Sequence, residues 1–202
     1  MRGSTSDKIY DIIRGLAAGT LVFSDDYLAF GPNSAVNMAL SRLAKEGVIH
    51  RLARGIYYTP KKDPELGPIR PSLEEVASAI ATKDRITIRP TGAYALNSLG
   101  LSTQVPTKVV FLTNGQSRKI KVGKGTITFK GTTQKIMAVQ SDLVFLCIQA
   151  LQELGKEGIT DDVINKLTNV LQSVGPEQLR NDAKLAPIWI RQILYSIANK
   201  LE

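Results

Sequence analysis

Two arginines, Arg51 and Arg54, stand beside a tight turn, Ala53-Arg54-Gly55, which directly follows an amphipathic helix predicted over residues 34–46. A guanidinium is permanently charged, and its fork of N–H donors fits phosphate oxygens. If the turn closes a hairpin, Arg54 lies at its tip and Arg51 at its base. Arginines so placed can follow a nucleic-acid backbone or enter a minor groove. The residues of this turn therefore predict binding to a polyanion.

The helix predicted over residues 34–46 has two different faces. Its apolar face carries, at helical spacing, Val36, Leu40 and Leu43. The opposite face has no acid, and its side chains are small, polar or basic, with one methionine: Ser34, Asn37, Met38, Ser41 and Lys45. Such a face suits a helix in a major groove, because polar side chains reach base edges and basic ones neutralise phosphate. An asparagine such as Asn37 can pair with adenine, and a serine at a helix N-terminus, such as Ser34, can help to hold a phosphate. We name these five residues and the two arginines as candidate DNA contacts.

A second basic stretch lies in the middle of the chain. Residues 118–135 contain six positive charges and no acid. The candidate contacts in this second surface are Arg118, Lys119, Lys121, Lys124 and Lys130. Strand alternation places the lysines opposite the apolar side chains of the same strands. This face could contact DNA backbone or an RNA such as tRNA, or its lysines could simply protect exposed strands from aggregation.

A smaller cluster comprises Arg85, Arg89, Thr91 and Tyr94. The sequence Pro90-Thr91-Gly92 precedes a predicted helix, whose first N–H groups could face an anion. Alternatively, Thr91 caps that helix and Tyr94 belongs to the core. We favour the cap.

The residue types needed for catalysis are scarce. The chain has one histidine, His50, in the predicted hairpin, and one cysteine, Cys147, so an intrachain disulfide is impossible. No phosphate-binding glycine motif is present, and the paired acids fall in predicted first turns of helices, where the helix dipole favours them. We predict no catalytic residue, no metal and no cofactor. The longest apolar run is too short to cross a bilayer, so we expect a cytoplasmic protein with no membrane partner.

The charge of +8 is unevenly distributed. Residues 1–70 carry ten Lys/Arg and seven Asp/Glu, residues 71–140 carry ten and three, and residues 141–202 carry six and eight. The basic excess therefore lies in the middle third.

The predicted elements form an α+β protein. Residues 1–62 have the order helix, strand, helix, turn, helix and two-stranded hairpin, typical of a winged helix-turn-helix DNA-binding domain. Residues 63–71 are rich in proline and are predicted to be a linker. Residues 72–202 form a mixed α/β domain with a small antiparallel sheet, in which Asn114-Gly115 indicates a hairpin, and a C-terminal helical bundle.

The first domain and residues 85–130, RITIRPTGAYALNSLGLSTQVPTKVVFLTNGQSRKIKVGKGTITFK, resemble the AbiE-type antitoxin family of bacterial abortive-infection toxin–antitoxin systems. The hairpin pattern R-x-x-R-G-I-Y-Y, the R-P-T-G-A-Y-A-L segment and a strand ending in T-N-G carry the resemblance. It implies an autorepressor that binds inverted repeats in its operator DNA. It also implies an antitoxin acting against a nucleotidyltransferase-like cognate toxin, without a stable complex, in phage defence.

Two alternatives to this interpretation remain. The acidic C-terminal helices, residues 141–202, could hold a partner protein, in which case the chain is an interaction adaptor. The basic sheet could make it an RNA-binding protein.

Overall fold

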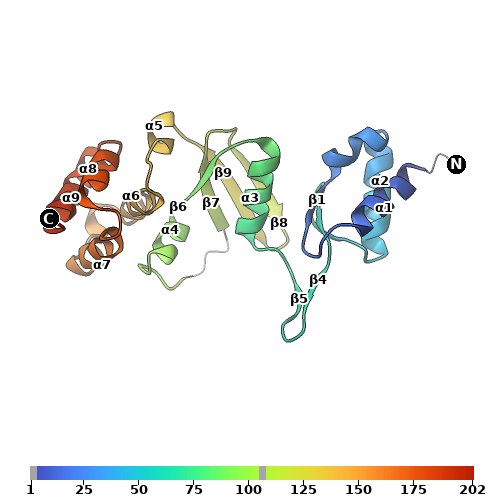
Figure 1. Ribbon diagram of the computed structural model, residues 1–202, viewed down its shortest axis with the longest axis horizontal. Helices are drawn as coiled ribbons and strands as arrows, with labels where there is room; N and C mark the ends of the chain where they lie inside the picture. Colours follow the sequence, from blue (N-terminus) through green and yellow to red (C-terminus); the bar gives the residue numbers. More distant parts are fainter. Residues whose placement is uncertain (1–3, 105–107) are drawn as a thin grey trace. The chain divides into compact units, whose positions relative to one another are not determined.

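The computed structural model describes residues 4–104 and 108–202 and has an α+β fold (Figure 1). Two compact units are present. The first comprises the chain up to Ile80 together with Ile120–Gly125, and the second comprises Ala81–Lys119 and Thr126–Glu202. The division lies beyond the predicted linker, and one short segment of the middle strands belongs to the first unit.

The first unit is built on three helical segments and a three-stranded sheet. Its elements up to the hairpin are α1 (Thr5–Arg14), β1 (Leu21–Phe23), the 3₁₀ helix η1 (Ser24–Phe30), α2 (Asn33–Lys45), β2 (His50–Ala53) and β3 (Ile56–Tyr58). The sheet has the antiparallel order β1-β3-β2. The fully buried side chains of its core include Ile9, Ile13, Val36, Leu40 and Ile49.

By residue type and position, Ser6 is predicted to cap the first helix, but the observed start of α1 differs from that prediction. Ser4 is the N-cap: its hydroxyl accepts from the Asp7 N–H, and the Asp7 carboxylate accepts from the Ser4 N–H at 2.9 Å. Hydrogen bonding to the carboxylate by the Ser4 side chain and by the Ser4 backbone N–H lowers the pKa of the Asp7 carboxyl. A serine two residues earlier therefore completes a capping box, which Ser6 cannot do.

The predicted linker contains a short hairpin. Its strands are β4 (Lys61–Asp63) and β5 (Gly67–Ile69), which pair in an antiparallel register. The Asp63 carboxylate accepts from the N–H groups of Leu66 and Glu65, and these bonds lower its pKa. The segment predicted to be a linker thus contains a turn between two paired strands, and its proline-rich composition coincides with that turn.

The capping-box pattern S-x-x-E at Ser72 and Glu75 predicts a helix start, and α3 (Leu73–Asp84) begins there. Ser72 and Glu75 form a capping box in which the Ser72 N–H donates to the Glu75 carboxylate at 2.7 Å.

A four-stranded sheet has the strand order β6-β7-β9-β8, and most of it belongs to the second unit. Its strands are β6 (Ile88–Thr91), β7 (Lys108–Thr113), β8 (Arg118–Val122) and β9 (Gly125–Gly131). The sheet is mixed, because β7 pairs antiparallel with β6 but parallel with β9. The prediction of an antiparallel sheet is therefore correct only in part.

The hairpin predicted at Asn114-Gly115 is wrong, since β7 and β8 are not neighbours. The Asn114 side-chain oxygen instead accepts from the Thr87 N–H at 2.8 Å. Strand β9 occupies the position beside β7, where Phe111 stacks on Phe129 with ring centroids 6.2 Å apart. The contact between these two buried rings stabilises the pairing of β7 with β9. It joins residues that are distant in the sequence, so a local turn pattern cannot indicate it.

Helices complete the second unit. They are α4 (Ala93–Ser98), α5 (Gln134–Met137), α6 (Asp142–Leu154), the 3₁₀ helix η2 (Lys156–Gly158), α7 (Asp161–Leu171), α8 (Pro176–Ala183) and α9 (Ile188–Lys200). Ser141 and Thr160 are predicted as helix caps by residue type and do cap α6 and α7, and Pro176 occupies the first turn of α8. The core of this helical part includes Val144, Ile148, Leu151, Leu167 and Leu194.

Candidate nucleic-acid interface and a polar pocket

Helix α2 has the two faces predicted from its sequence. Its apolar side chains are buried, whereas all five candidate DNA contacts on the other face are exposed: Ser34, Asn37, Met38, Ser41 and Lys45. Met38 is 73% exposed, which is unusual for a large apolar side chain. The face therefore presents an amide, two hydroxyls, a thioether and an ammonium group to solvent.

A second amide on this face was missed from the sequence. Asn37 Nδ2 donates to Asn33 Oδ1 at 2.5 Å, one helical turn earlier. The spacing of four residues was the available signal, because such residues are neighbours on a helix surface. Arg42 on the same helix is bound to Glu46, with Nε 2.9 Å from the carboxylate. Its charge is therefore already balanced.

The hairpin formed by β2 and β3 follows α2 closely, since the Val48 N–H donates to Leu43 O at 3.0 Å. Arg51 and Arg54 are both exposed on it. The Arg51 Nε donates to Ala53 O at 3.3 Å across a register irregularity, and Gly55 adopts φ +71 in the turn. A turn position with positive φ favours glycine, so the glycine at position 55 indicates this turn for a direct conformational reason.

The aromatic residues of the hairpin pack inward. Tyr57 and Tyr58 are buried, and His50 lies against the Tyr58 ring with centroids 5.4 Å apart. The hairpin therefore offers its two arginines, and not its tyrosines, for contact.

The second predicted surface is divided between the two units. Lys121 and Lys124 belong to the segment counted with the first unit, where the Gly123 N–H donates to Leu52 O at 3.2 Å. Both lysines are exposed. The turn after β8 thus adds positive charge beside strand β2 in the unit that carries Arg51 and Arg54.

The other members, Arg118, Lys119 and Lys130, lie in the second unit. Arg118 forms an ion pair with Asp84, and its guanidinium lies 5.2 Å from the centre of the Phe129 ring. Lys119 is exposed. Lys130 is exposed as well, and it lines a pocket. These three residues therefore have three different surroundings.

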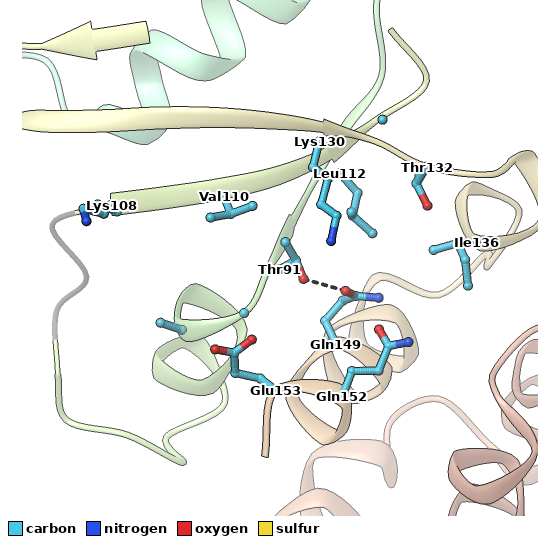
Figure 2. Close-up of a pocket in the computed structure, with 13 residues that line it drawn as sticks. Thr91, Lys108, Val110, Leu112, Lys130, Thr132, Ile136, Gln149, Gln152 and Glu153 are labelled. Carbon is cyan, nitrogen blue, oxygen red and sulfur yellow. Dashed lines mark hydrogen bonds between the residues drawn. The ribbon is translucent and has the colours of Figure 1, made fainter. Parts of the chain in front are cut away.

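This pocket has a volume of about 530 Å³ and lies between the sheet and α6 (Figure 2). Thr91 Oγ1 donates to Gln149 Oε1 at 2.5 Å on its wall. Thr91 was favoured as a helix cap, but Gly92 is the N-cap of α4 and the Thr91 hydroxyl is bound to α6. The contact joins residues 58 apart in the chain, so no local signal could reveal it.

Arg89 and Tyr94 are used within the protein. Arg89 is 8% exposed; it donates to Val139 O and to the Asp142 carboxylate, both at 2.6 Å, and lies 3.9 Å from the centre of the Phe145 ring. Tyr94 is half-buried, with its ring centroid 6.4 Å from that of Phe111. Arg89 is therefore a structural tie between β6 and α6, and its guanidinium is already engaged.

Burial also determines the chemistry of Cys147. Desolvation raises the pKa of its thiol to about 12, so that the nucleophilic thiolate is disfavoured at neutral pH. Within residues 4–104 and 108–202, no three His, Cys, Asp or Glu side chains are grouped so that they could hold a metal ion. Over the same residues, each helix is too short or too polar to cross a membrane.

These features define an α+β protein of two units, one with an exposed polar helix face beside a basic hairpin and one with a polar pocket. The chain belongs to a family of unknown function, DUF6088, whose model matches residues 8–179. No protein of curated function matches the sequence. Among solved structures, the chain is similar to the Rv2827c protein from Mycobacterium tuberculosis, at 11% identity and a TM-score of 0.47, covering 96% of this chain and 80% of the other.

Proposed function

We propose that the first unit is a winged helix-turn-helix that binds DNA, with α2 as its recognition helix and β2–β3 as its wing. The observation that carries the proposal is the exposed face of α2, which has no acid among its five candidate contacts and is followed at once by a hairpin with two exposed arginines. A polar, acid-free helix face suits a major groove, where amides and hydroxyls meet base edges.

Each part of this surface has a distinct expected role. The Asn33–Asn37 amide pair would contact base edges, and an asparagine can bind adenine through two hydrogen bonds. Ser34 and Lys45, near the two ends of α2, would contact phosphates. Arg54 and Arg51 would follow the backbone or enter the minor groove beside the site.

The biological role that fits this binding is autorepression of the protein's own operon, together with antitoxin activity against a nucleotidyltransferase-like toxin. That role rests on the resemblance of the sequence to the AbiE-type antitoxin family. An operator with inverted repeats would seat two copies of the chain, because the symmetry of the DNA is matched by two related protein surfaces. Antitoxin activity would be measured as restored growth of cells that express the cognate toxin.

The test of DNA binding is a gel-shift titration on the DNA upstream of the gene and on scrambled DNA of equal length, at two salt concentrations. The variants are Arg54→Ala and, as a matched control, Lys62→Ala, which removes an exposed charge from β4. We expect preference for the upstream DNA. The Arg54→Ala variant should bind more weakly, with a salt slope lower by about 1, as for one lost phosphate contact.

Asn37→Ala distinguishes recognition from general attraction. Loss of a base contact should narrow the difference between upstream and scrambled DNA by about 1–3 kcal/mol and leave the salt slope unchanged. Equal binding of wild-type protein to both DNAs, or an unaltered Arg54→Ala variant at both salt concentrations, would show that the proposal is wrong.

A second candidate function, RNA binding, is favoured by the exposure of Lys119 and Lys121 on one face of β8. Single-stranded RNA is held in part by positive surfaces that follow its backbone. Charge reversal with Lys119→Glu and Lys121→Glu should abolish RNA binding. Lys119→Glu alone, which changes only the second unit, should spare operator binding. Retention of RNA binding in this double variant would exclude the lysine surface.

A further inference from the structure

DNA binding by the first unit leaves the pocket of the second unit without a role. The pocket is bordered by the sheet on one side and by α4 and α6 on the other. Its volume of about 530 Å³ falls within the range of about 300–1,000 Å³ that is usual for small-molecule sites. Its walls are both polar and apolar, which is the arrangement expected of a site for a polar organic molecule.

The wall of the pocket contains an unsatisfied polar group. Gln149 is only 3% exposed, and its Oε1 is occupied by the Thr91 hydroxyl. Its Nε2 is buried and has no hydrogen-bond partner among the described residues. A buried amide donor without a partner is unfavourable, because it has lost its hydrogen bonds to water without replacement, and a ligand acceptor would remove that cost.

Three donor-bearing groups face the same end of the pocket. Lys130 and Thr132 extend toward the Thr91–Gln149 pair from β9 and the segment after it (Figure 2). An ammonium, a hydroxyl and the unpartnered amide N–H together suit an anion with several acceptor oxygens. Lys130 lies at this end of the pocket, because it is in register with Leu112 of β7. Lys108 is four residues away from Leu112 along β7 and does not lie at this end.

The rest of the pocket has a different character. The Glu153 carboxylate lies on α6 close to Gly92, where an added Cβ would be 3.2 Å from Glu153 Oε2. A carboxylate accepts hydrogen bonds only, so it suits hydroxyl or amino groups of a ligand. Val110, on β7 between Lys108 and Leu112, supplies an apolar surface in this part of the pocket.

We propose that the pocket binds a nucleoside monophosphate group. Its phosphate is held by Lys130, Thr132 and the Gln149 amide, its sugar hydroxyls donate to Glu153, and its base lies against Val110. A single phosphate or small carboxylate would leave most of the volume unused and would give Glu153 no partner. The group could be a free mononucleotide or the terminal nucleotide of an RNA, since both present the same chemistry. The proposal does not depend on DNA binding by the first unit.

The test is isothermal titration calorimetry on the full chain with the four ribonucleoside 5′-monophosphates, the corresponding nucleosides, and a short RNA with or without a 5′-phosphate. The variants are Lys130→Met and Gln149→Leu. Lys156→Met is the matched control, because Lys156 is an exposed lysine of the second unit that does not line the pocket. Thermal unfolding followed by circular dichroism reports whether each variant is folded.

We expect at least one monophosphate or the 5′-phosphorylated RNA to bind. The nucleoside, which lacks the phosphate, should bind the wild-type protein at least about tenfold more weakly than the monophosphate does. The monophosphate should likewise bind Lys130→Met and Gln149→Leu at least about tenfold more weakly, because each change removes a hydrogen bond to a charged group. The control should bind as the wild type does. Binding of the mononucleotide alone identifies a free ligand, whereas binding of the 5′-phosphorylated RNA alone identifies an RNA end, and both support the pocket.

The proposal is overturned if no mononucleotide and no RNA binds at millimolar concentration, or if binding is unchanged in Lys130→Met. Lys130 is exposed, so this variant leaves the core intact and decides the question even if Gln149→Leu fails to fold.

Discussion

The buried aspartate of α8 gives the sharpest prediction about stability. Asp182 is 2% exposed, and its two carboxylate oxygens accept from two consecutive backbone N–H groups, those of Gln140 at 2.9 Å and Ser141 at 2.8 Å. Ser141 is the N-cap of α6. One side chain of α8 therefore fixes the point at which the central helix of the second unit begins.

The magnitude follows from these two bonds. A hydrogen bond to a charged group contributes about 1.5–3 kcal/mol net, so Asp182→Ala, which removes two, should lower the free energy of unfolding by about 3–6 kcal/mol. Asp182→Asn keeps the shape but has only one acceptor oxygen, and its amide N–H groups face a backbone donor. We expect it to cost about 2–3 kcal/mol.

The assay is urea unfolding followed by the fluorescence of Trp189, which is the only tryptophan and lies on α9 in the second unit. Its signal reports on the unit that contains Asp182. The control is Asp162→Ala, which removes an exposed acid from an ion pair with Lys166 on α7 and should cost no more than about 0.5 kcal/mol. The slope of the free energy against urea should not change.

A cost below about 0.5 kcal/mol for Asp182→Asn would refute the reasoning, because it would mean that the two N–H groups find other acceptors without loss.

Three further predictions concern the remaining buried or strained positions. Arg89→Met should destabilise the second unit by about 2–3 kcal/mol in the same urea assay, since it leaves Val139 O without its donor; a neutral result would contradict the role of Arg89 as a tie. Gly55→Ala should lower the melting temperature of the first unit, at a cost of about 1–2 kcal/mol, because φ is +71 and the new Cβ would lie 2.7 Å from Ser24 Oγ; an unchanged melting temperature would disprove it. The pKa of the Cys147 thiol is raised from 9.0 to about 12 by burial, so the thiol should resist alkylation in the native protein, and the folded state should lose stability as the pH rises from 9 toward 12, where only the unfolded thiol ionises readily. Cys147→Ala should abolish that part of the alkaline loss, and rapid native-state alkylation would contradict the burial.

The sequence allowed much of the first unit to be predicted. The burial of Val36 and Leu40 and the exposure of Asn37 and Lys45 follow from helical periodicity alone. The turn at Gly55 follows from the conformational freedom of glycine. These features depend on neighbours a few residues away, so the sequence contains their causes.

The second unit was predicted less completely, and the errors have one physical origin. Asn114-Gly115 favours a hairpin locally, but the Phe111–Phe129 contact places β9 beside β7. Thr91 is a reasonable cap by type, but its hydroxyl is bound to Gln149. In both cases a contact between distant residues outweighs a local preference.

The sequence by itself determined which helix faces are polar, where helices such as α3, α6 and α7 begin, and where the positive charge gathers, because periodicity, capping and charge are local properties. Only the tertiary structure decided the parallel pairing of β7 with β9, the burial of Asp182 beneath the start of α6, and the pocket around Gln149. Asp182 and Ser141 are 41 residues apart, and Thr91 and Gln149 are 58 apart. Contacts at such separations form when the whole chain buries its apolar surface, and no short window of residues specifies which partners then meet.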